Sequence, residues 1–431
     1  MDLSYYGRAE AAYRKSLALT PNYANAMVGI AWVLSGRHEF EQSIEWANKV
    51  LKAEPDRADA YGLLGDAATE MGDYDSAFEY YQKMLDLKPD IASYSRSAHL
   101  LLITGGFKQA TFLMSKAIGA SAAYPENKAW CIAQMALLDF SQGGYLPAEQ
   151  LLSQGLKDTP NNYHLLAAMG KVKGAEKDYA AAIEFYKRAE AIVPQHDVVV
   201  ALGDLYTLQG QTEEAAKQYA LVDFIRKLSK ANGVIGDLQM AQFLADHDRD
   251  LEEALRLAEA EYKTRLTVYG ADTLACPGAI TRAERIAEAR KYSAEASSQQ
   301  TPEAMFLYHR GMILAKAGDN GGARKALYQA LSQNPYFDPL GAQAAMKKVQ
   351  ELGAATASEN ELDHRRLVDA TRVRLEVITR EGVCPCARST ADLVKFAVTA
   401  LPSSRGLIAQ VSKERAVLIH VDQRIETHVA A

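Results

Sequence analysis

Residues 58–90 read ADAYGLLGDAATEMGDYDSAFEYYQKMLDLKPD. This stretch holds two runs of apolar and small residues at helical spacing, separated by the turn signal Gly72-Asp73 and closed by Pro89. Gly65 in the first run leaves room for a close helix crossing, and the large residues three or four positions away fill the remaining space. The stretch therefore predicts two antiparallel helices joined by a tight turn.

The same arrangement recurs along the chain at a fixed interval. Pro21, Pro55 and Pro89 lie 34 residues apart, and Pro160 and Pro194 repeat that interval. A fixed period of this kind is typical of a solenoid, in which each unit buries its apolar face only against its neighbours. Because such arrays present surface and seldom carry out chemistry, the period favours a binding scaffold.

Further copies identify the kind of repeat. The clearest occupy residues 163–195, 196–233 and 304–337, and weaker ones occupy residues 24–57, 91–128, 129–162 and 234–268. Gly170, Gly203 and Gly311 stand where Gly65 does. In these residues the chain resembles the tetratricopeptide repeat, whose pattern is W-x2-L-G-x2-Y, then A-x3-F, then P. The resemblance covers roughly residues 1–352 and implies an all-α fold, a right-handed superhelix of helix–turn–helix repeats.

The repeat divides the chain into parts. We expect a half repeat at 1–23, repeats over about 24–337, a capping helix at 341–352, a linker at 353–360 and a C-terminal extension of uncertain order at 361–431. The extension contains neither Tyr nor Trp, unlike the Tyr-rich array. It carries candidate helices around 361–380 and 391–401 and a candidate strand at 416–421. Either a small partner-specific domain or a poorly ordered extension fits this weak patterning, and the second is favoured.

The pattern breaks in the copy at residues 269–303. Cys276-Pro277-Gly278 falls in its first helix, where proline removes a backbone hydrogen bond at a cost of about 3 kcal/mol. We expect that helix to be shortened or kinked, and the second helix to run from about Ile286 through Ala296. A local shift of reading frame at this break or in the extension is a further hypothesis, which translation of the gene in all frames would test.

Composition excludes several classes of function. With 48 basic and 54 acidic residues the net charge is −6, so no strongly basic surface indicates nucleic acid or an anionic membrane. No run of 18 apolar residues indicates membrane insertion. Without a recognisable secretory signal, the cytoplasm is the default location. The unpaired half repeat at 1–23 raises the hypothesis that the natural product extends upstream, with an export signal possible.

Local patterns for chemistry are also missing. The sequence has no P-loop, dinucleotide-binding glycine motif, H-E-x-x-H or G-x-S-x-G. We therefore predict no catalytic residue, no cofactor and no metal site. Residues 246–250 read DHDRD, which begins like a calcium loop but lacks the required Gly and final Glu, so a solvated turn is expected. The pair Cys384 and Cys386 has no second ligand pair within reach, and an incidental loop is favoured.

Three histidines and the concave face complete the sequence prediction. We expect His164, His196 and His309 to be surface or packing residues, because no carboxylate or Cys partner stands at ligand spacing. In tetratricopeptide repeats the first helix of each unit lines the concave groove. The candidate partner-binding residues there are Trp32, Asp66, Trp130, Leu137, Phe140, Lys171, Asp204, Tyr308 and Met312. Their aromatic members are candidate hot spots, although packing between repeats is the commoner role for aromatics at helical spacing.

These observations predict a protein–protein interaction scaffold that binds a peptide or protein in its groove and carries out no catalysis. Only Lys171 is basic among the groove positions, which disfavours a clamp for a peptide carboxylate. The alternative is a non-catalytic or substrate-positioning subunit of an enzyme complex. Helical-repeat RNA binding would need basic inner faces that this sequence lacks. The oligomeric state is not determined by these patterns.

Overall fold

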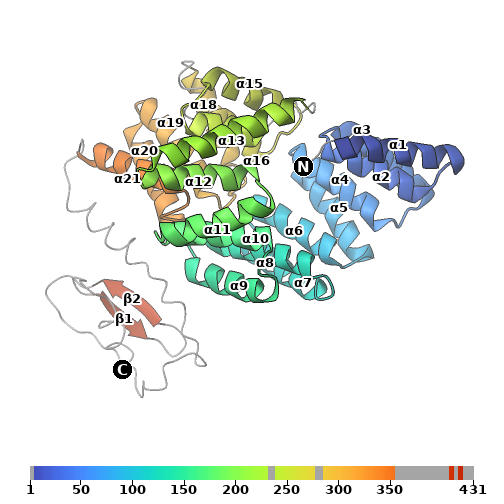
Figure 1. Cartoon of the computed structure of the whole chain (residues 1–431), viewed down its shortest axis with the longest axis horizontal. Coiled ribbons are helices and arrows are strands. Elements are labelled where there is room, and N and C mark those ends of the chain that lie inside the picture. Colours follow the sequence, from blue (N-terminus) through green and yellow to red (C-terminus); the bar gives the residue numbers. More distant parts are fainter. Residues whose placement is uncertain (1–3, 232–237, 277–284, 355–406, 412–415, 421–431) are drawn as a thin grey trace. The chain divides into compact units, whose positions relative to one another are not determined.

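The computed structural model describes residues 4–231, 238–276, 285–354, 407–411 and 416–420. The chain divides into two compact units, Met1–Leu352 and Gly353–Ala431. Every described regular element of the first unit is a helix, which confirms the predicted all-α class. In Figure 1 successive helical hairpins of this unit follow one another in colour order, from blue at the N-terminus to orange.

The helices of the first unit are α1 (Ser4–Leu19), α2 (Ala24–Gly36), α3 (Phe40–Ala53), α4 (Ala58–Glu70), α5 (Tyr74–Leu87), α6 (Ile91–Ile103), α7 (Phe107–Ala120), α8 (Pro125–Ser141), α9 (Tyr145–Asp158), α10 (Tyr163–Ala175), α11 (Tyr179–Ile192), α12 (His196–Leu208), α13 (Thr212–Ala231), α14 (Leu238–Asp246), α15 (Leu251–Tyr262), α16 (Val268–Ala275), α18 (Ile286–Ala296), α19 (Ala304–Lys316), α20 (Asn320–Gln333) and α21 (Pro339–Ala354). Consecutive helices pack in pairs, as the repeat pattern predicts.

At two of the hairpin crossings, a glycine of the first helix faces the ring of a tyrosine of the second helix. A β-carbon placed on Gly65 would lie 2.3 Å from the ring of Tyr81, and one placed on Gly203 would lie 2.4 Å from the ring of Tyr219. Both contacts are shorter than van der Waals separation, so each crossing requires glycine on the first helix. The predicted small-and-large code is therefore the packing rule of these hairpins.

The break in the pattern shortens one helix. Helix α16 ends at Ala275 after 8 residues, and Cys276 is its C-terminal cap. Helix α18 then spans Ile286–Ala296, the residues expected for the second helix of this copy. The proline at position 277 itself lies outside the described residues. Helix α21 covers the positions where a capping helix is expected.

The first unit also contains a contact that no repeat pattern predicts. The turns near residues 70–74, 103–106 and 140–145 lie against the loops near residues 265–268, 299–303 and 333–336. The paired positions are about 195 residues apart in each case. One turn of the superhelix therefore brings late repeats back onto early ones. We call this line of contacts the seam.

Hydrogen bonds between side chains and backbone groups help to hold the seam together. The N–H of Val268 donates to the hydroxyl of Tyr74 at 3.1 Å. The side-chain amide of Asn334 donates to the carbonyl oxygen of Phe140 at 2.8 Å, while its oxygen accepts from the hydroxyl of Tyr145. These partners come from turns and loops whose polar groups would otherwise need water.

Glycine allows the turns to approach at two points of the seam. Gly72 has φ +77° and its β-position lies 2.4 Å from the carbonyl oxygen of Leu266. Gly105 has φ +79° and lies close to the carbonyl oxygen of Gln299 in the same way. The apolar part of the seam is a cluster in which Ile103 and Phe306 are both buried. The Gly turns thus serve both hairpin reversal and seam contact.

The second unit contains an antiparallel two-stranded ladder. Strand β1 spans Leu407–Val411 and strand β2 spans Ala416–His420, with Leu407 opposite His420. The strand expected from the sequence at 416–421 is present as β2. The helices expected around 361–380 and 391–401, and the pair Cys384 and Cys386, lie outside the described residues. No described helix of the chain is long and apolar enough to cross a membrane.

Candidate functional site

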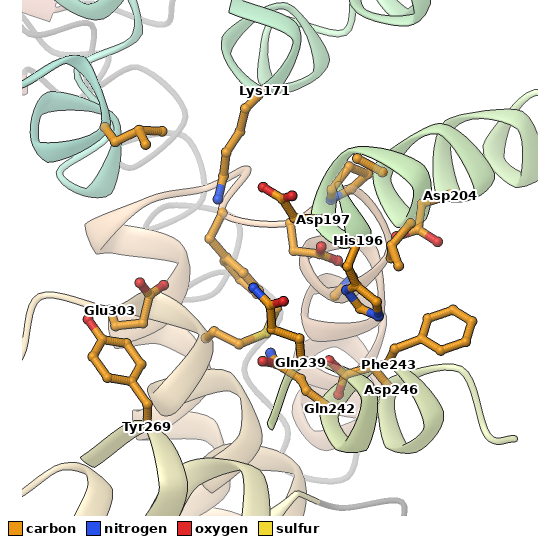
Figure 2. Close-up of a pocket in the computed structure, with 18 of the residues that line it drawn as sticks. Lys171, His196, Asp197, Asp204, Gln239, Gln242, Phe243, Asp246, Tyr269 and Glu303 are labelled. Atoms are coloured by element: carbon orange, nitrogen blue, oxygen red, sulfur yellow. The ribbon is translucent and has the colours of Figure 1, made fainter. Parts of the chain in front are cut away.

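The first helices of successive hairpins surround a large cavity. Its volume is about 1430 Å³, and its lining comes mainly from α4, α6, α8, α10, α12, α14, α16, α19 and α21 and the loops beside them, with smaller contributions from α11 and α15. Figure 2 shows Lys171 of α10, Asp197 of α12 and Glu303 beside α19 around the same space. The cavity is the concave face of the superhelix, and the seam helps to enclose it because it joins the two ends of one superhelical turn.

Six of the nine sequence-predicted binding residues line this cavity: Trp130, Leu137, Phe140, Lys171, Asp204 and Tyr308. They come from α8, α10, α12 and α19, which are not consecutive in the chain. The concave positions of the repeat pattern therefore do converge on one space. Whether these residues contact a partner stays a prediction.

The other three lie elsewhere. Trp32 is exposed and its ring lies 5.7 Å from that of Tyr6. Asp66 forms an ion pair with Arg96 at 2.8 Å and accepts a hydrogen bond from the hydroxyl of Tyr81. Met312 is partly buried on α19 and is not part of the lining. The ion pair gives Asp66 a role in packing α4 against α6, since the two partners belong to those helices.

One wall of the cavity combines aromatic rings with lysines. The Nζ of Lys171 lies 5.1 Å from the ring centre of Phe140, and the Nζ of Lys177 lies 4.7 Å from that of Tyr336. A cation over an aromatic face is attracted by the ring quadrupole, by about 0.5–2 kcal/mol. These contacts hold both lysines close to the wall.

The described lining is strongly acidic. Its carboxylates belong to Glu70, Asp197, Asp204, Asp246, Asp248, Glu261, Asp272, Glu303 and Asp338. Its lysine and arginine side chains are Lys171, Lys177 and Arg265, and its histidines are His38, His99, His164, His196, His247 and His309. Arg265 is bound to two of these acids, with 2.6 Å to Glu70 and 2.7 Å to Glu261. Walls of low dielectric focus the field of the remaining carboxylates into the cavity.

Burial raises the pKa values of two of the lining carboxyl groups. Burial, together with the nearby charge of Asp204, raises the pKa of Asp338 to about 6. Asp338 also caps helix α21, because its carboxylate accepts the backbone N–H of Leu340 at 3.0 Å. Burial likewise raises the pKa of Glu303. A raised carboxyl pKa means that ionisation is costly here and that a cationic group brought close would be stabilised.

Asp204 is engaged by two neighbours. It accepts a hydrogen bond of 2.7 Å from the hydroxyl of Tyr219 and lies 2.6 Å from Nε2 of His247. Burial disfavours the charged imidazole, but the contact with Asp204 outweighs it and raises the pKa of His247. Asp204 thus links α12 to α13 and to the end of α14, in addition to facing the cavity.

A cluster at one end of the cavity corrects two expectations from the sequence. His309 is fully buried, as a packing residue would be, but it has carboxylate partners that its sequence spacing did not indicate: Nδ1 lies 2.8 Å from Oδ2 of Asp272, and Nε2 lies 3.2 Å from Oδ1 of Asp246. The thiol of Cys276 donates to the same Asp246 oxygen at 3.1 Å. Asp246 and His247 line the cavity, so they do not belong to a merely solvated turn.

The sequence analysis missed this cluster because its members are up to 63 positions apart, far from any local motif. One signal was present: Asp272 and Cys276 are four residues apart, which places them on one face of a helix. Their helix, α16, lies between α14 and α19 in contact with both. First helices of three successive repeats therefore bring the cluster together.

Comparison with solved structures gives similar helical proteins at low identity. The PilF protein of Pseudomonas aeruginosa has a TM-score of 0.40 and 18% identity, covering 52% of this chain and 97% of its own. PilW, a type IV pilus biogenesis factor, has a TM-score of 0.40 and 17% identity, covering 46% and 91%. Yeast Tom70 has a TM-score of 0.38 and 16% identity, covering 84% and 88%. No curated protein sequence matches the chain.

An all-α solenoid of paired helices around a concave cavity defines a helical-repeat protein. Residues 28–90 and 282–336 match the family model of the tetratricopeptide repeat. These two regions are therefore tetratricopeptide repeats. Superhelices of this class are interaction scaffolds that present extended concave surfaces to other proteins.

Proposed function

We propose that this protein binds a segment of a partner protein in the cavity of its superhelix, and that the segment carries basic side chains. The observation that supports the proposal is the excess of carboxylates over lysine and arginine side chains in the described lining. A polypeptide with lysine or arginine is the occupant whose charge complements that lining.

The size of the cavity favours a polypeptide over a small metabolite. Small-molecule sites usually enclose about 300–1,000 Å³, whereas this cavity encloses about 1430 Å³. The excess volume suits an extended or helical segment of several residues, which is the kind of ligand that concave repeat surfaces accept.

The lining offers apolar groups that would strengthen peptide binding and carboxylates that would orient the peptide. Trp130, Leu137 and Phe140 supply apolar contact along α8, and aromatic anchors dominate the energetics of many interfaces. Asp197 is exposed to the cavity on α12, and no ion pair engages it within the described part of the chain. Asp197 and Asp338 both line the cavity, so a basic side chain brought there would be attracted and an acidic one repelled.

The test uses three fluorescently labelled peptides of equal length and aromatic content, one lysine-rich, one neutral and one glutamate-rich. Their affinity for the full chain is measured by fluorescence polarisation. We expect the lysine-rich peptide to bind best and its affinity to fall with added salt, because the attraction is electrostatic. Equal affinity for the lysine-rich and glutamate-rich peptides would contradict the proposal.

A matched pair of double variants locates the site. Asp197→Asn with Asp338→Asn removes two charges from the cavity and should weaken lysine-rich peptide binding roughly tenfold or more, at about 1 kcal/mol per charge. Asp56→Asn with Asp75→Asn removes two exposed charges outside the lining and should leave affinity unchanged. Equal affinity in the two double variants would place the site elsewhere.

The pKa of Asp338 adds a dependence on pH. Since this pKa is about 6, the carboxyl is neutral below that pH and negative above it. We expect the affinity for the lysine-rich peptide to rise as the pH increases from 5 to 7, and the rise to be smaller in Asp338→Asn. Polarisation titrations across this range measure it, and an equal rise in the variant would show that other groups cause it.

A further inference from the structure

We infer that Asp246, Cys276 and His309 form a binding site for a divalent transition-metal ion, with zinc as the best match. The three side chains supply one oxygen, one sulfur and one nitrogen, and these ligand atoms all lie within 4.8 Å of one another. Zinc accepts all three atom types, whereas magnesium and calcium prefer oxygen alone. The inference goes beyond peptide binding and does not depend on it.

The separations between ligand atoms suit tetrahedral coordination. They are 3.1 Å from Sγ of Cys276 to Oδ1 of Asp246, 3.2 Å from that oxygen to Nε2 of His309, and 4.0 Å from that nitrogen to the sulfur. Zinc bonds of about 2.0 Å to N and O and 2.3 Å to S place two ligand atoms about 3.3–3.6 Å apart at tetrahedral corners. Side-chain shifts of about half an ångström would complete the geometry.

Asp272 supplies the outer contact that a metal-binding histidine requires. Its Oδ2 lies 2.8 Å from Nδ1 of His309. Histidines that bind metals almost always donate their other ring N–H to a carboxylate or carbonyl, which directs the free nitrogen toward the ion. Here that arrangement leaves Nε2 of His309 facing Asp246 and Cys276.

A second, independent observation points to a cation at this place. Asp272 is 3% exposed, and within the described residues its other oxygen, Oδ1, has no hydrogen-bond partner. A buried carboxylate oxygen without a donor costs free energy unless a positive charge lies nearby. A divalent ion bound to His309 would place two positive charges beside Asp246 and Asp272.

The site is shielded on one side and open on the other. His309 and Cys276 are 0% and 1% exposed, whereas the side chain of Asp246 is 24% exposed toward the cavity. Three protein ligands leave the fourth tetrahedral corner for water or for a donor atom of a bound molecule, as in zinc sites that retain an open position. The ion would therefore be accessible from the cavity.

The first experiment adds cobalt(II) to the full chain and records its optical spectrum. The parent protein is Cys131→Ala, Cys384→Ser, Cys386→Ser, so that Cys276 is the sole cysteine, and it is freed of metal by chelation beforehand. We expect one equivalent of cobalt to produce a thiolate-to-cobalt charge-transfer band and d–d bands of tetrahedral intensity. Zinc should displace the cobalt with a dissociation constant on the order of 1 µM or tighter.

Variants then assign the ligands. Cys276→Ser, which is nearly isosteric, should abolish the charge-transfer band, and Asp246→Asn, which faces the cavity, should weaken binding at least hundredfold. Asp272→Asn should keep the band but weaken zinc roughly 10–100-fold, the usual effect of removing an outer contact. Asp75→Asn is the matched control, since it removes an exposed carboxylate outside the cavity, and it should keep the band and the affinity.

Two results would overturn the inference. One is a parent protein that shows no charge-transfer band with equimolar cobalt, which would mean that the cluster is only a hydrogen-bonded network. The other is Cys276→Ser binding zinc as tightly as the parent. The parent measurement leaves all four residues of the cluster unchanged, so a cluster variant that fails to fold cannot obscure the answer.

Discussion

At the scale of single residues, the recurring feature is a glycine of one helix that lies against a large side chain of its partner at the hairpin crossing. Gly65 contacts the ring of Tyr81, and Gly170 contacts that of Tyr186. Helices that approach this closely gain dispersion contacts along both backbones, and a larger side chain at the crossing would force them apart. Where no neighbouring group lies close to the helix, glycine destabilises the helix relative to alanine.

Gly65→Ala and Gly119→Ala separate these two effects. Both glycines lie in helices, but nothing lies within 4 Å of a β-carbon at Gly119. We expect Gly65→Ala to destabilise the protein by about 1–3 kcal/mol through overpacking, and Gly119→Ala to stabilise it by about 0.5–1 kcal/mol. Denaturant titration followed by circular dichroism measures both, and an equal or higher midpoint for Gly65→Ala would refute the packing argument.

At the scale of elements, the seam sets this molecule apart from a simple array. In a simple solenoid each hairpin contacts only its neighbours. Here the turn after α8 contacts the loop before α21 through Asn334, which is 1% exposed. Its amide and carbonyl groups serve Phe140 and Tyr145, so the two chain segments share one buried polar contact.

Asn334→Ala tests the strength of that contact. The change leaves the carbonyl oxygen of Phe140 without its donor, which costs about 1–3 kcal/mol when the group stays buried. We expect a lower unfolding midpoint and faster amide exchange in the segment from Phe140 to Tyr145. Asn320→Ala, at an exposed first position of α20, is the matched control and should leave both unchanged. Unaltered exchange in Asn334→Ala would show that the seam does not depend on this residue.

At the scale of the whole first unit, the seam couples repeats that are far apart in sequence. Stability in a linear solenoid is a sum of unit and nearest-neighbour terms, so a change at one end fades with distance. The seam adds contacts about 195 residues apart. It also helps to enclose the acidic cavity, because both sides of the cavity wall meet there.

Ending the chain after Tyr262 removes one side of the seam. We expect faster amide exchange not only in α14 and α15, next to the cut, but also in the turns after α4, α6 and α8. Helices α2 and α3, which take no part in the seam, should keep their exchange rates and serve as the internal control. Hydrogen–deuterium exchange with mass spectrometry measures all of these segments, and unchanged turns after α4 to α8 would mean that the array behaves as a linear solenoid.

The sequence by itself determined the hairpin, its period and the all-α class, because Gly65, Tyr81 and Pro89 act within one repeat and the pattern recurs. It also indicated six of the cavity residues, since the first helix of each repeat has a defined inner face. It could not reveal the seam, because contacts about 195 residues apart depend on the pitch of the superhelix, which accumulates from small rotations between repeats.

The cluster of Asp246, Asp272, Cys276 and His309 was decided by tertiary structure alone. The sequence analysis treated Asp246 as part of a turn, Cys276 as part of a break in the pattern and His309 as a surface or packing residue, and nothing in the sequence connected them. Stacking α14, α16 and α19 side by side brings an oxygen, a sulfur and a nitrogen into one small space. Local patterns specify how each hairpin folds, but which side chains meet across three hairpins follows from the superhelical stacking of the helices.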